Sequence, residues 1–152
     1  MPPIVSHEYF MRLALNQAKI AQAFGDAPVG AIIVKNGAVI GRGRNQREEK
    51  NDPAGHAEIL ALRDAAAQIG SWRLDECSLY CTLEPCVMCS GAIVAARIAH
   101  LYYGAPDPKA GGIESLYQIA EDARLNHQVL VHSGILREAC EELLKDFFER
   151  LR

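Results

Sequence analysis

Long apolar runs and an excess of either charge are both missing from this sequence. No stretch of its 152 residues approaches the roughly 18 apolar residues of a membrane-spanning helix. Lys and Arg number 16 against 19 Asp and Glu, which gives a net charge of −3. That balance excludes a strongly basic nucleic-acid coat and a polybasic membrane binder, although it leaves room for a local basic cluster. Residues 1–12 also lack the apolar core of a secretory signal, so we expect a cytoplasmic protein without membrane contact.

Cysteine is scarce and odd in number, and repeats and linkers are absent. The five cysteines are unevenly spaced, which in a reducing compartment favours metal binding or catalysis over a disulfide framework. No internal repeat, low-complexity tract or Ser/Pro-rich linker divides the chain. With 49% hydrophobic and 23% charged residues, the composition is that of an ordinary globular protein, which at this length needs no disulfide to fold. We therefore predict a single domain over residues 1–152.

The first half of the chain predicts a helix, a hairpin and a second helix. Ser6 is placed to cap the first helix, and Gly25 ends its apolar periodicity. Asn36-Gly37 lies between two apolar runs and suits the positive φ angles of a type I′ turn, so we expect these runs to pair as antiparallel strands. The predicted elements of this half are a helix from Ser6 to Gly25, strands at 28–35 and 38–43, and a helix from about Gly55 to Gln68.

The second half alternates strands with helices. Strands joined by helical crossovers pair in parallel, so we expect the last three strands to be mutually parallel. The predicted elements are strands at 78–83, 98–104 and 128–132, and helices at 85–97, 113–122 and 135–151. The pattern therefore predicts a three-layer α/β fold, with a five-stranded mixed sheet covered by helices on both faces.

Two short segments carry residues suited to metal chemistry. His56-Ala57-Glu58 and Pro85-Cys86-Val87-Met88-Cys89 each fall at the predicted start of a helix. Cysteines three apart on a first helical turn lie on one face and can reach a single ion. A helix N-terminus also favours thiolate over thiol. Pro85 suits the first turn, because its missing N–H would have no partner there.

The two segments together supply the parts of a catalytic zinc site. His56, Cys86 and Cys89 are three nitrogen and sulfur donors, a set that suits zinc. Three protein ligands leave one tetrahedral position for water, whose pKa zinc lowers to about 7. Glu58 can approach that water without ligating the metal and can carry its proton. The residues thus predict one Zn²⁺ per chain and metal-assisted hydrolysis at an electrophilic carbon.

Each segment has a simpler interpretation when it is taken alone. A Cys-x-x-Cys pair also occurs in redox sites and as half of a structural zinc site, and His-x-Glu arises by chance. A redox pair usually has a thioredoxin-like setting, which Val87-Met88 does not indicate. A structural zinc needs a fourth ligand, and the nearest candidate, Cys81, is more simply a small buried hydrophobe in a strand. The occurrence of both segments at helix starts favours a catalytic zinc.

The combination of His-x-Glu with Pro-Cys-x-x-Cys resembles the zinc signature of the nucleobase deaminases. Over nearly its whole length the chain is similar to the bacterial tRNA-specific adenosine deaminases. The core motif is common to the cytidine-deaminase-like superfamily, whereas the form Thr-Leu-Glu-Pro-Cys-Val-Met-Cys at 82–89 is more specific to the tRNA enzymes. The other similar segments are Ser-His-Glu-Tyr-Phe-Met-Arg at 6–12, Pro-Val-Gly-Ala at 28–31, His-Ala-Glu-Ile at 56–59, Leu-Asn-His at 125–127 and Asp-Phe-Phe at 146–148.

The resemblance implies a cytidine-deaminase-like fold and a defined reaction. Members of the family deaminate adenosine to inosine at the wobble position of a tRNA anticodon, as homodimers. Zinc-activated water would attack C6 of adenine, and Glu58 would carry the proton to ring N1 and then to the departing ammonia. A tRNA anticodon stem-loop suits this chemistry, because its loop bases are single-stranded and can be splayed into a pocket.

The resemblance also implies five substrate-binding residues. Asn45 matches an asparagine that hydrogen-bonds the flipped base, and Val29 matches a residue that lines the base pocket. Asp107 matches a position near the sugar and backbone of the target nucleotide, and Asn126 matches one that contacts the loop beside it. Phe148 is expected to border the RNA groove, while the phenylalanine before it packs in the core. These positions also suit ordinary turn, strand and helix residues.

Two features bear on RNA binding in particular. Glu114 stands where relatives often have glycine, and an acid near a phosphate path would weaken binding unless it faces away or pairs with a base. Because the net charge is negative, an RNA footprint needs a local basic cluster. Such a run is also typical of a solvated surface. The candidate cluster comprises Lys35, Arg42, Arg44, Arg47 and Lys50, with Lys109, Arg150 and Arg152 as further candidates.

Two other functions compete with this interpretation. A free nucleobase or nucleoside deaminase of the same superfamily, acting on guanine or cytosine, would use the same four residues but lack an RNA-binding rim. A non-catalytic module stabilised by zinc would bind RNA or protein. Glu58 argues against the module, because an ionisable group beside an open zinc position has little structural purpose.

Overall fold

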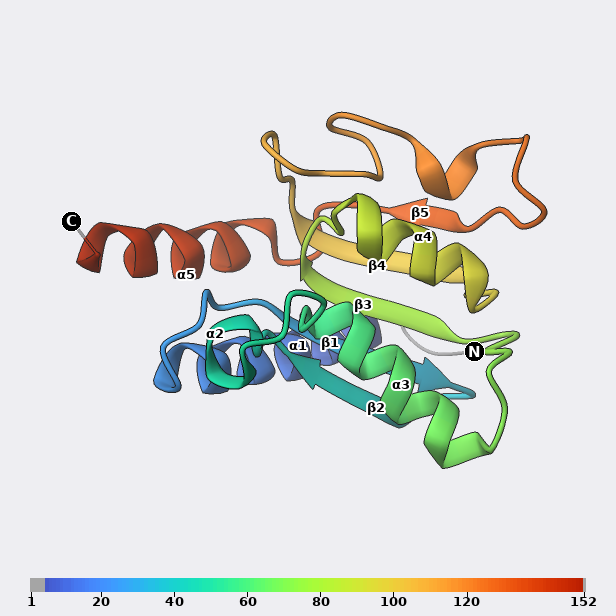
Figure 1. Cartoon of the computed structure of the whole chain (residues 1–152), viewed down its shortest axis with the longest axis horizontal. Helices are drawn as coiled ribbons and strands as arrows, with labels where there is room; N and C mark the ends of the chain where they lie inside the picture. The colour runs from blue at the N-terminus through green and yellow to red at the C-terminus, as the bar shows by residue number, and fades with distance from the viewer. Residues whose placement is uncertain (1–4, 152) are drawn as a thin grey trace.

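One five-stranded mixed sheet organises the chain in the computed structural model, which describes residues 5–151 (Figure 1). The strand order is β2-β1-β3-β4-β5. The strands are β1 (Gly30–Lys35), β2 (Ala38–Arg44), β3 (Ser78–Leu83), β4 (His100–Ala105) and β5 (Leu130–His132). The helices are α1 (Val5–Ala23), α2 (Arg47–Lys50), α3 (Ala57–Ile69), α4 (Val87–Ala95), the 3₁₀ turn η1 (Ile119–Glu121) and α5 (Arg137–Arg150).

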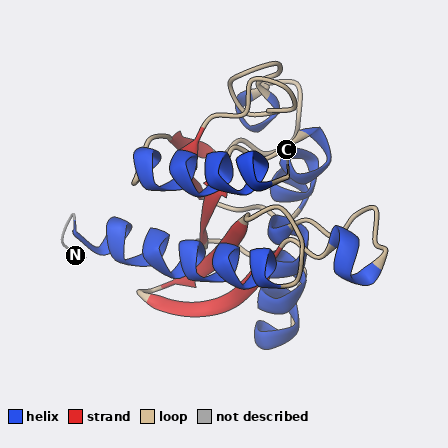
Figure 2. Cartoon of the chain, turned by 90° about the vertical axis from the view of Figure 1, so that its left-hand side faces the viewer, coloured by secondary structure: helices blue, strands red, loops and turns tan. Residues whose placement is uncertain are grey.

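The sheet topology confirms the predicted fold class. β1 pairs antiparallel with both β2 and β3, whereas β3, β4 and β5 are mutually parallel neighbours. The hairpin between β1 and β2 turns at Asn36 and Gly37, whose φ angles are 50° and 76°, as the type I′ turn requires. Helices α1 and α5 cover one face and α3 and α4 cover the other, which makes three layers (Figure 2). The fold is that of the cytidine-deaminase-like proteins.

Alternate side chains of each strand enter two different cores. Ile33, Leu79 and Leu101 pack on the face under α3 and α4. Ile32 and Tyr80 pack on the opposite face against α1. This alternation follows from the two-residue period of a strand, and it explains why the central strands consist almost entirely of apolar residues.

Glycines in β2 allow α3 to lie directly on the sheet. A Cβ atom at Gly43 would overlap the carbonyl oxygen of Ala57 and would lie 2.6 Å from the nitrogen of Ala61. A Cβ at Gly41 would lie 2.6 Å from the carbonyl oxygen of Ala61. Because both side chains are absent, the first turns of α3 contact the β2 backbone closely. The start of α3 is thereby fixed relative to the sheet.

The predicted helix at 113–122 is wrong, except for the single turn η1. The N–H groups of Ile113, Glu114 and Ser115 all donate to the buried carboxylate of Glu84. The N–H of Leu116 then donates to the carbonyl of Gly111, five residues back. Contacts with a distant side chain thus replace the regular i to i−4 ladder of an α-helix.

One short helix was not predicted, and the starts of two other helices differ from the sequence prediction. Helix α2 lies in a segment expected to be irregular, because Asp26 accepts hydrogen bonds from the N–H groups of Glu48 and Glu49 at its first turn. Helix α1 begins at Val5, so Ser6 lies inside its first turn and is not the N-cap; the sequence signal there was only half of a capping box. Helix α4 begins at Val87, and Pro85 lies before its N-cap.

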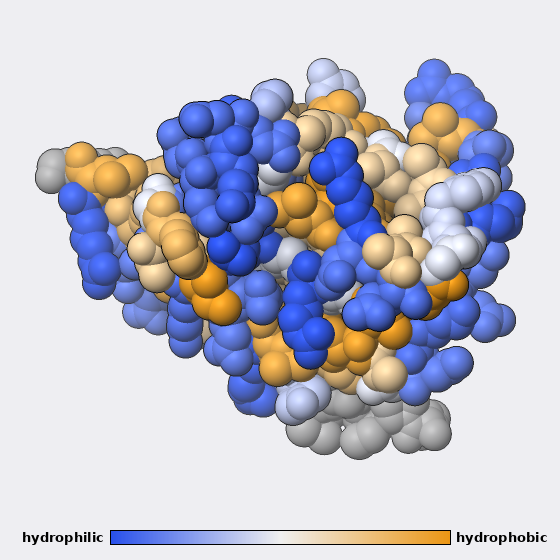
Figure 3. Space-filling model, turned by 60° about the horizontal axis from the view of Figure 1, so that its bottom comes forward, coloured by the Kyte–Doolittle hydropathy of each residue, from blue (hydrophilic) through white to orange (hydrophobic). Residues whose placement is uncertain are grey.

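The surface of the molecule mixes hydrophilic and hydrophobic residues. On the face shown in Figure 3, hydrophobic residues lie between projecting hydrophilic side chains and also reach the rim of the molecule. Within residues 5–151, no helix is both long enough and apolar enough to cross a membrane. The organisation of residues 1–152 as one domain stays a prediction, consistent with the single sheet that collects strands from both halves of the chain.

Candidate active site

Two helix starts bring the three predicted metal ligands together. His56 is the N-cap of α3, Cys86 is the N-cap of α4, and Cys89 lies in the first turn of α4. The Sγ atoms of both cysteines lie 3.5 Å from Nδ1 of His56. All three donor atoms lie within 4.8 Å of one another, the only such cluster of three or more His, Cys, Asp or Glu donors among the described residues. Donors at this separation can reach a single ion.

Ionisation of the two cysteines is unequal. Hydrogen bonds from Cys89 and with His56 lower the pKa of the Cys86 thiol to about 4, so Cys86 is a thiolate at neutral pH. The same hydrogen bond, together with burial, raises the pKa of Cys89, which keeps its proton. The thiolate of Cys86 in turn raises the pKa of His56. Two sulfur donors and one nitrogen donor fit the ligand preferences of zinc, and the Cys86 sulfur is already anionic.

Glu58 projects from the first turn of α3 into the cavity beside the ligand cluster. Its side chain is buried, and desolvation raises the pKa of the carboxyl. The cavity has a volume of about 200 Å³ and is lined by Glu58, His56 and Cys86 together. A carboxyl group whose pKa is raised beside a metal site is suited to accept and return a proton.

Three predicted substrate-binding residues line the same cavity. Val29, Asn45 and Asp107 contribute to its wall. The Asn45 amide is held on both sides, because its Nδ2 donates to the carbonyl of Ala27 at 3.3 Å and its Oδ1 accepts from the N–H of Arg47 at 3.1 Å. Its backbone N–H donates to the carbonyl of Val29. The ends of β1 and β2 therefore hold Asn45 and Val29 side by side.

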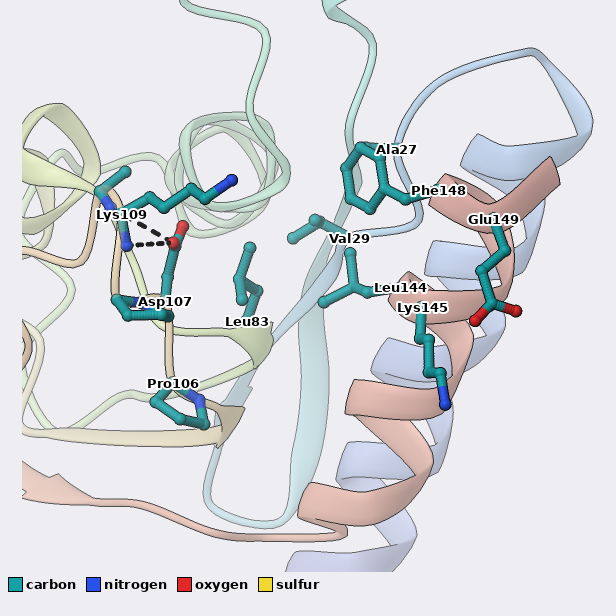
Figure 4. Close-up of a pocket in the computed structure, with 12 residues that line it drawn as sticks. Ala27, Val29, Leu83, Pro106, Asp107, Lys109, Leu144, Lys145, Phe148 and Glu149 are labelled. Carbon is teal, nitrogen blue, oxygen red and sulfur yellow. Dashed lines mark hydrogen bonds between the residues drawn. The ribbon is translucent and has the colours of Figure 1, made fainter. Parts of the chain in front are cut away.

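Asp107 organises the loop that follows β4. Its Oδ1 accepts hydrogen bonds from the N–H groups of Lys109 and Ala110, at 3.1 and 3.2 Å (Figure 4). Asp107 and Ala110 both line the catalytic cavity. Asp107 thus forms the turn and also lines the cavity, while its contact with the substrate stays a prediction.

A larger groove opens beside the catalytic cavity. It measures about 840 Å³ and shares Val29, Leu83 and Asp107 with the cavity. Its far wall is α5, from which Phe148 points across the groove toward Val29 (Figure 4). Phe148 is 51% exposed. The expectation that Phe147 packs in the core is wrong: it is half-buried and lines a further cavity of about 480 Å³, because α5 extends past the end of the sheet (Figure 1).

Asn126 does not lie in this site. It is exposed on the loop between η1 and β5, and the neighbouring His127 contacts the carbonyl of Ile98 at 2.7 Å. Ile98 precedes β4, whereas the cavity lies where β3 and β4 end. Parallel strands carry their two ends at opposite edges of a sheet, so Asn126 lies at the edge away from the cavity.

Glu114 also faces away from the catalytic cavity. Its carboxylate accepts a hydrogen bond from the hydroxyl of Tyr103 at 2.7 Å and lines a separate cavity with Arg137. Within the basic cluster, Arg44 forms an ion pair with Glu49 at 3.0 Å. Arg47 is the member of that cluster that lines the catalytic cavity.

The sequence did not single out Glu84, which is buried immediately before Pro85. Burial opposes its ionisation, but hydrogen bonds from Ser115 and from three backbone N–H groups lower the pKa of its carboxyl. The sequence did offer one signal: an acidic residue stands between an apolar strand and the cysteines, where burial is expected. A buried acid usually has a specific partner, so Glu84 could have been identified as a residue with a structural role.

Comparisons with known proteins agree on one family. The model of the MafB19-like deaminases matches residues 5–152. A tRNA-specific adenosine deaminase of Streptococcus pyogenes serotype M1 is 49% identical over 144 residues, covering 95% of this chain and 84% of that protein. A structure from a study of A-to-I editing by tRNA:A34 deaminases at the wobble position is 43% identical, with a TM-score of 0.86 over 90% of this chain and 99% of that one. A guanine deaminase from Bacillus subtilis is also 43% identical, with a TM-score of 0.63, but covers 66% of this chain and 64% of its own.

The family match over residues 5–152 includes all five strands and both helix starts that carry the His-x-Glu and Pro-Cys-x-x-Cys segments. The chain therefore belongs to the MafB19-like deaminases and, among its relatives, to the family of the tRNA-specific adenosine deaminases.

Proposed function

We propose that this chain hydrolyses adenosine to inosine at the wobble position of a tRNA anticodon loop. Relatives at 43–49% identity over 95% of the chain are named tRNA-specific adenosine deaminases. The observation that carries the proposal is the opening of a catalytic cavity of about 200 Å³ into a groove of about 840 Å³. A free base needs only the cavity, whereas a base extended from an RNA loop needs room for its neighbours.

His56, Cys86 and Cys89 would hold one Zn²⁺ per chain. Bound zinc lowers the pKa of water toward 7 and so supplies a nucleophile at neutral pH. His56 and Cys86 line the same cavity as Glu58, so a zinc ion held there would adjoin that cavity, as is expected of a catalytic site and not of a structural one.

Glu58 would carry the proton through the reaction. Water adds to C6 of adenine, the new C6–O bond forms, and the C6–N bond breaks to release ammonia. Glu58 accepts the proton of the attacking water, gives it to ring N1, and assists the protonation of the departing amine. The raised pKa of Glu58 suits the carboxyl group both to accept a proton from water and to donate it to the base, because its pKa is then closer to neutral pH.

The other residues would position the RNA. Asn45 and Val29 would hold the flipped base, with the Asn45 amide already oriented by Ala27 and Arg47. Asp107 would contact the sugar and backbone of the target nucleotide, and Phe148 would stack on a neighbouring base across the groove. Asn126 is too far from the cavity of its own chain for the target itself, so we assign it to a more distant part of the RNA.

We further propose a cytoplasmic homodimer, because transfer RNA is a cytoplasmic substrate and the family resemblance implies two subunits. The exposed side chains of Val87 and Met88, at the start of α4, are candidates for the interface between two copies. Analytical ultracentrifugation of the wild type and of Met88→Glu tests this: a dimer that the substitution dissociates is expected, and a monomeric wild type would overturn it.

The reaction itself is tested on a panel of substrates. Zinc-loaded protein is incubated with an anticodon stem-loop that carries adenosine at the wobble position, and in parallel with free adenosine, guanine and cytosine. Inosine from the stem-loop alone is expected. Ammonia from guanine or cytosine but not from the stem-loop would support the free-base deaminase, the interpretation that similarity to a guanine deaminase favours.

A further inference from the structure

Glu84 lies between the metal-ligand helix and the loop that forms one wall of the cavity. Its side chain is 2% exposed, and it immediately precedes the Pro85-Cys86 segment. Such a buried carboxylate is costly unless it is paired or hydrogen-bonded. No cation accompanies it among the ion pairs of the described residues. Its charge is therefore balanced by hydrogen-bond donors alone.

All of those donors belong to one loop. Oε1 accepts from the N–H of Asp107 at 2.9 Å and from the hydroxyl of Ser115. Oε2 accepts from the N–H groups of Ile113, Glu114 and Ser115, at 3.2, 2.8 and 2.9 Å. The carboxylate thus joins both ends of the segment 107–115, which contains no regular helix or strand of its own.

The loop is fitted closely around this carboxylate. A Cβ atom at Gly111 would overlap the Glu84 carboxyl group, so only glycine leaves room there. Gly111 also forms an isolated β-bridge with Cys86, and the N–H of Gly112 donates to the carbonyl of Pro85 at 2.8 Å. The same loop is therefore attached to the metal-ligand segment on one side and to the Glu84 carboxylate on the other.

We propose that Glu84 is a positioning residue, which holds the 107–115 loop in the geometry that binds the substrate. The loop supplies Asp107 and Ala110 to both the cavity and the adjoining groove, and Pro108 and Lys109 to the groove. Glu84 acts through the loop, because its own oxygens are engaged by five donors. The identity of the substrate in this inference rests on the proposed function, whereas the anchoring of the loop by Glu84 does not.

The test substitution is Glu84→Gln, which preserves size but exchanges one acceptor oxygen for an NH₂ donor that faces N–H groups. Hydrogen exchange of the 107 and 113–115 amides is expected to accelerate at least tenfold, while exchange in α3 and the zinc content of one per chain stay unchanged. KM for the substrate is expected to rise at least tenfold, with kcat within about threefold of the wild type. A merely destabilised protein would show the opposite split, because fewer active molecules lower the apparent kcat and leave KM unchanged.

Two further variants complete the experiment. Ser115→Ala removes only the hydroxyl, one of the five donors to Glu84, and is the milder change. It is therefore expected to raise KM, but by less than Glu84→Gln does. Combined with Glu84→Gln, it is expected to add little, because both changes disturb one interaction. Tyr103→Phe is the matched control. It removes a hydrogen bond to Glu114 in the same loop but leaves all five hydrogen bonds to the Glu84 carboxylate in place. KM is expected to stay within twofold of the wild-type value.

Unchanged exchange at the four amides, or unchanged KM in Glu84→Gln, would overturn the proposal. The substrate for the kinetic comparison is whichever the wild type deaminates. If the wild type accepts a free base and not the stem-loop, the proposed function fails, while the amide exchange and the KM comparison on that base still decide the role of Glu84.

Discussion

The contact between β2 and α3 predicts a large effect of one small substitution, Gly43→Ala. The added Cβ would overlap the carbonyl oxygen of Ala57 and lie 2.6 Å from the nitrogen of Ala61, where ordinary contacts are 3.4–4 Å. Neither neighbour is a flexible side chain, so the backbone of α3 has to move by about 1 Å. Overpacking of this kind costs about 1–3 kcal/mol of unfolding free energy.

The displaced turn of α3 carries His56 and Glu58, which adds a loss of activity to the loss of stability. A misplacement of about 1 Å near reacting groups costs about 100-fold in rate. We therefore expect Gly43→Ala to lower kcat/KM by about 100-fold at a temperature where the variant is still folded. Urea denaturation followed by circular dichroism measures the first effect, and inosine formation measures the second.

Gly91→Ala is the matched control for this experiment. Gly91 lies inside α4, and a Cβ there meets no atom within 4 Å. Alanine is favoured over glycine in a helix, so this variant is expected to gain up to about 1 kcal/mol. Wild-type stability and activity in Gly43→Ala would refute the argument that close contact between β2 and α3 sets the position of the catalytic turn.

Three other substitutions or treatments probe the site. Glu58→Gln is expected to lower kcat by about 100- to 10,000-fold, while zinc content and the unfolding curve match the wild type; retained turnover would remove Glu58 from proton transfer. Zinc binding at pH 7 is expected to release the proton of Cys89, since Cys86, with a pKa of about 4, is already ionised. Because binding releases this proton, affinity should fall as the pH decreases from 7, and it should fall more steeply near pH 4, where Cys86 is also protonated. Calorimetry in buffers of different ionisation enthalpy measures that proton, and its absence would contradict the unequal ionisation. Phe148→Ala is expected to raise KM for the stem-loop about 5- to 150-fold, because base stacking on an aromatic ring contributes about 1–3 kcal/mol; an unchanged KM would place the RNA elsewhere.

Local patterns predicted most of the fold. The Asn36-Gly37 turn, the parallel pairing of the last three strands and the two helix starts with metal ligands all follow from short-range rules, and the structure agrees with each. These features depend on backbone conformation and periodicity within a few residues, which a single sequence displays directly.

Features that depend on distant contacts were not predictable in the same way. The expected helix at 113–122 is replaced by hydrogen bonds to Glu84, which lies 29 to 31 residues earlier. Helix α2 begins where Asp26 accepts hydrogen bonds from the N–H groups of Glu48 and Glu49, which lie 22 and 23 residues later in the chain. In both cases a buried carboxylate decides the local conformation, and the partner of such a group cannot be identified from the sequence around it.

The residues of the candidate site also differ in how well the sequence predicted them. His56, Glu58, Cys86 and Cys89 came from spacing and donor chemistry, and the structure brings all four together. Asn45, Val29, Asp107, Phe148 and Asn126 came only from resemblance. The first three line the cavity and the fourth lines the adjoining groove, whereas Asn126 lies at the far edge of the sheet.

Deamination at the wobble position alone is tested by moving the target adenosine along the loop. Two anticodon stem-loops are compared, one with its single adenosine at the wobble position and one with that adenosine moved by one nucleotide. Inosine is measured by mass spectrometry after incubation with zinc-loaded wild type and with Glu58→Gln. We expect inosine in the first stem-loop only, and only with the wild type. Equal conversion of both stem-loops, or conversion of free guanine in preference to either, would contradict it.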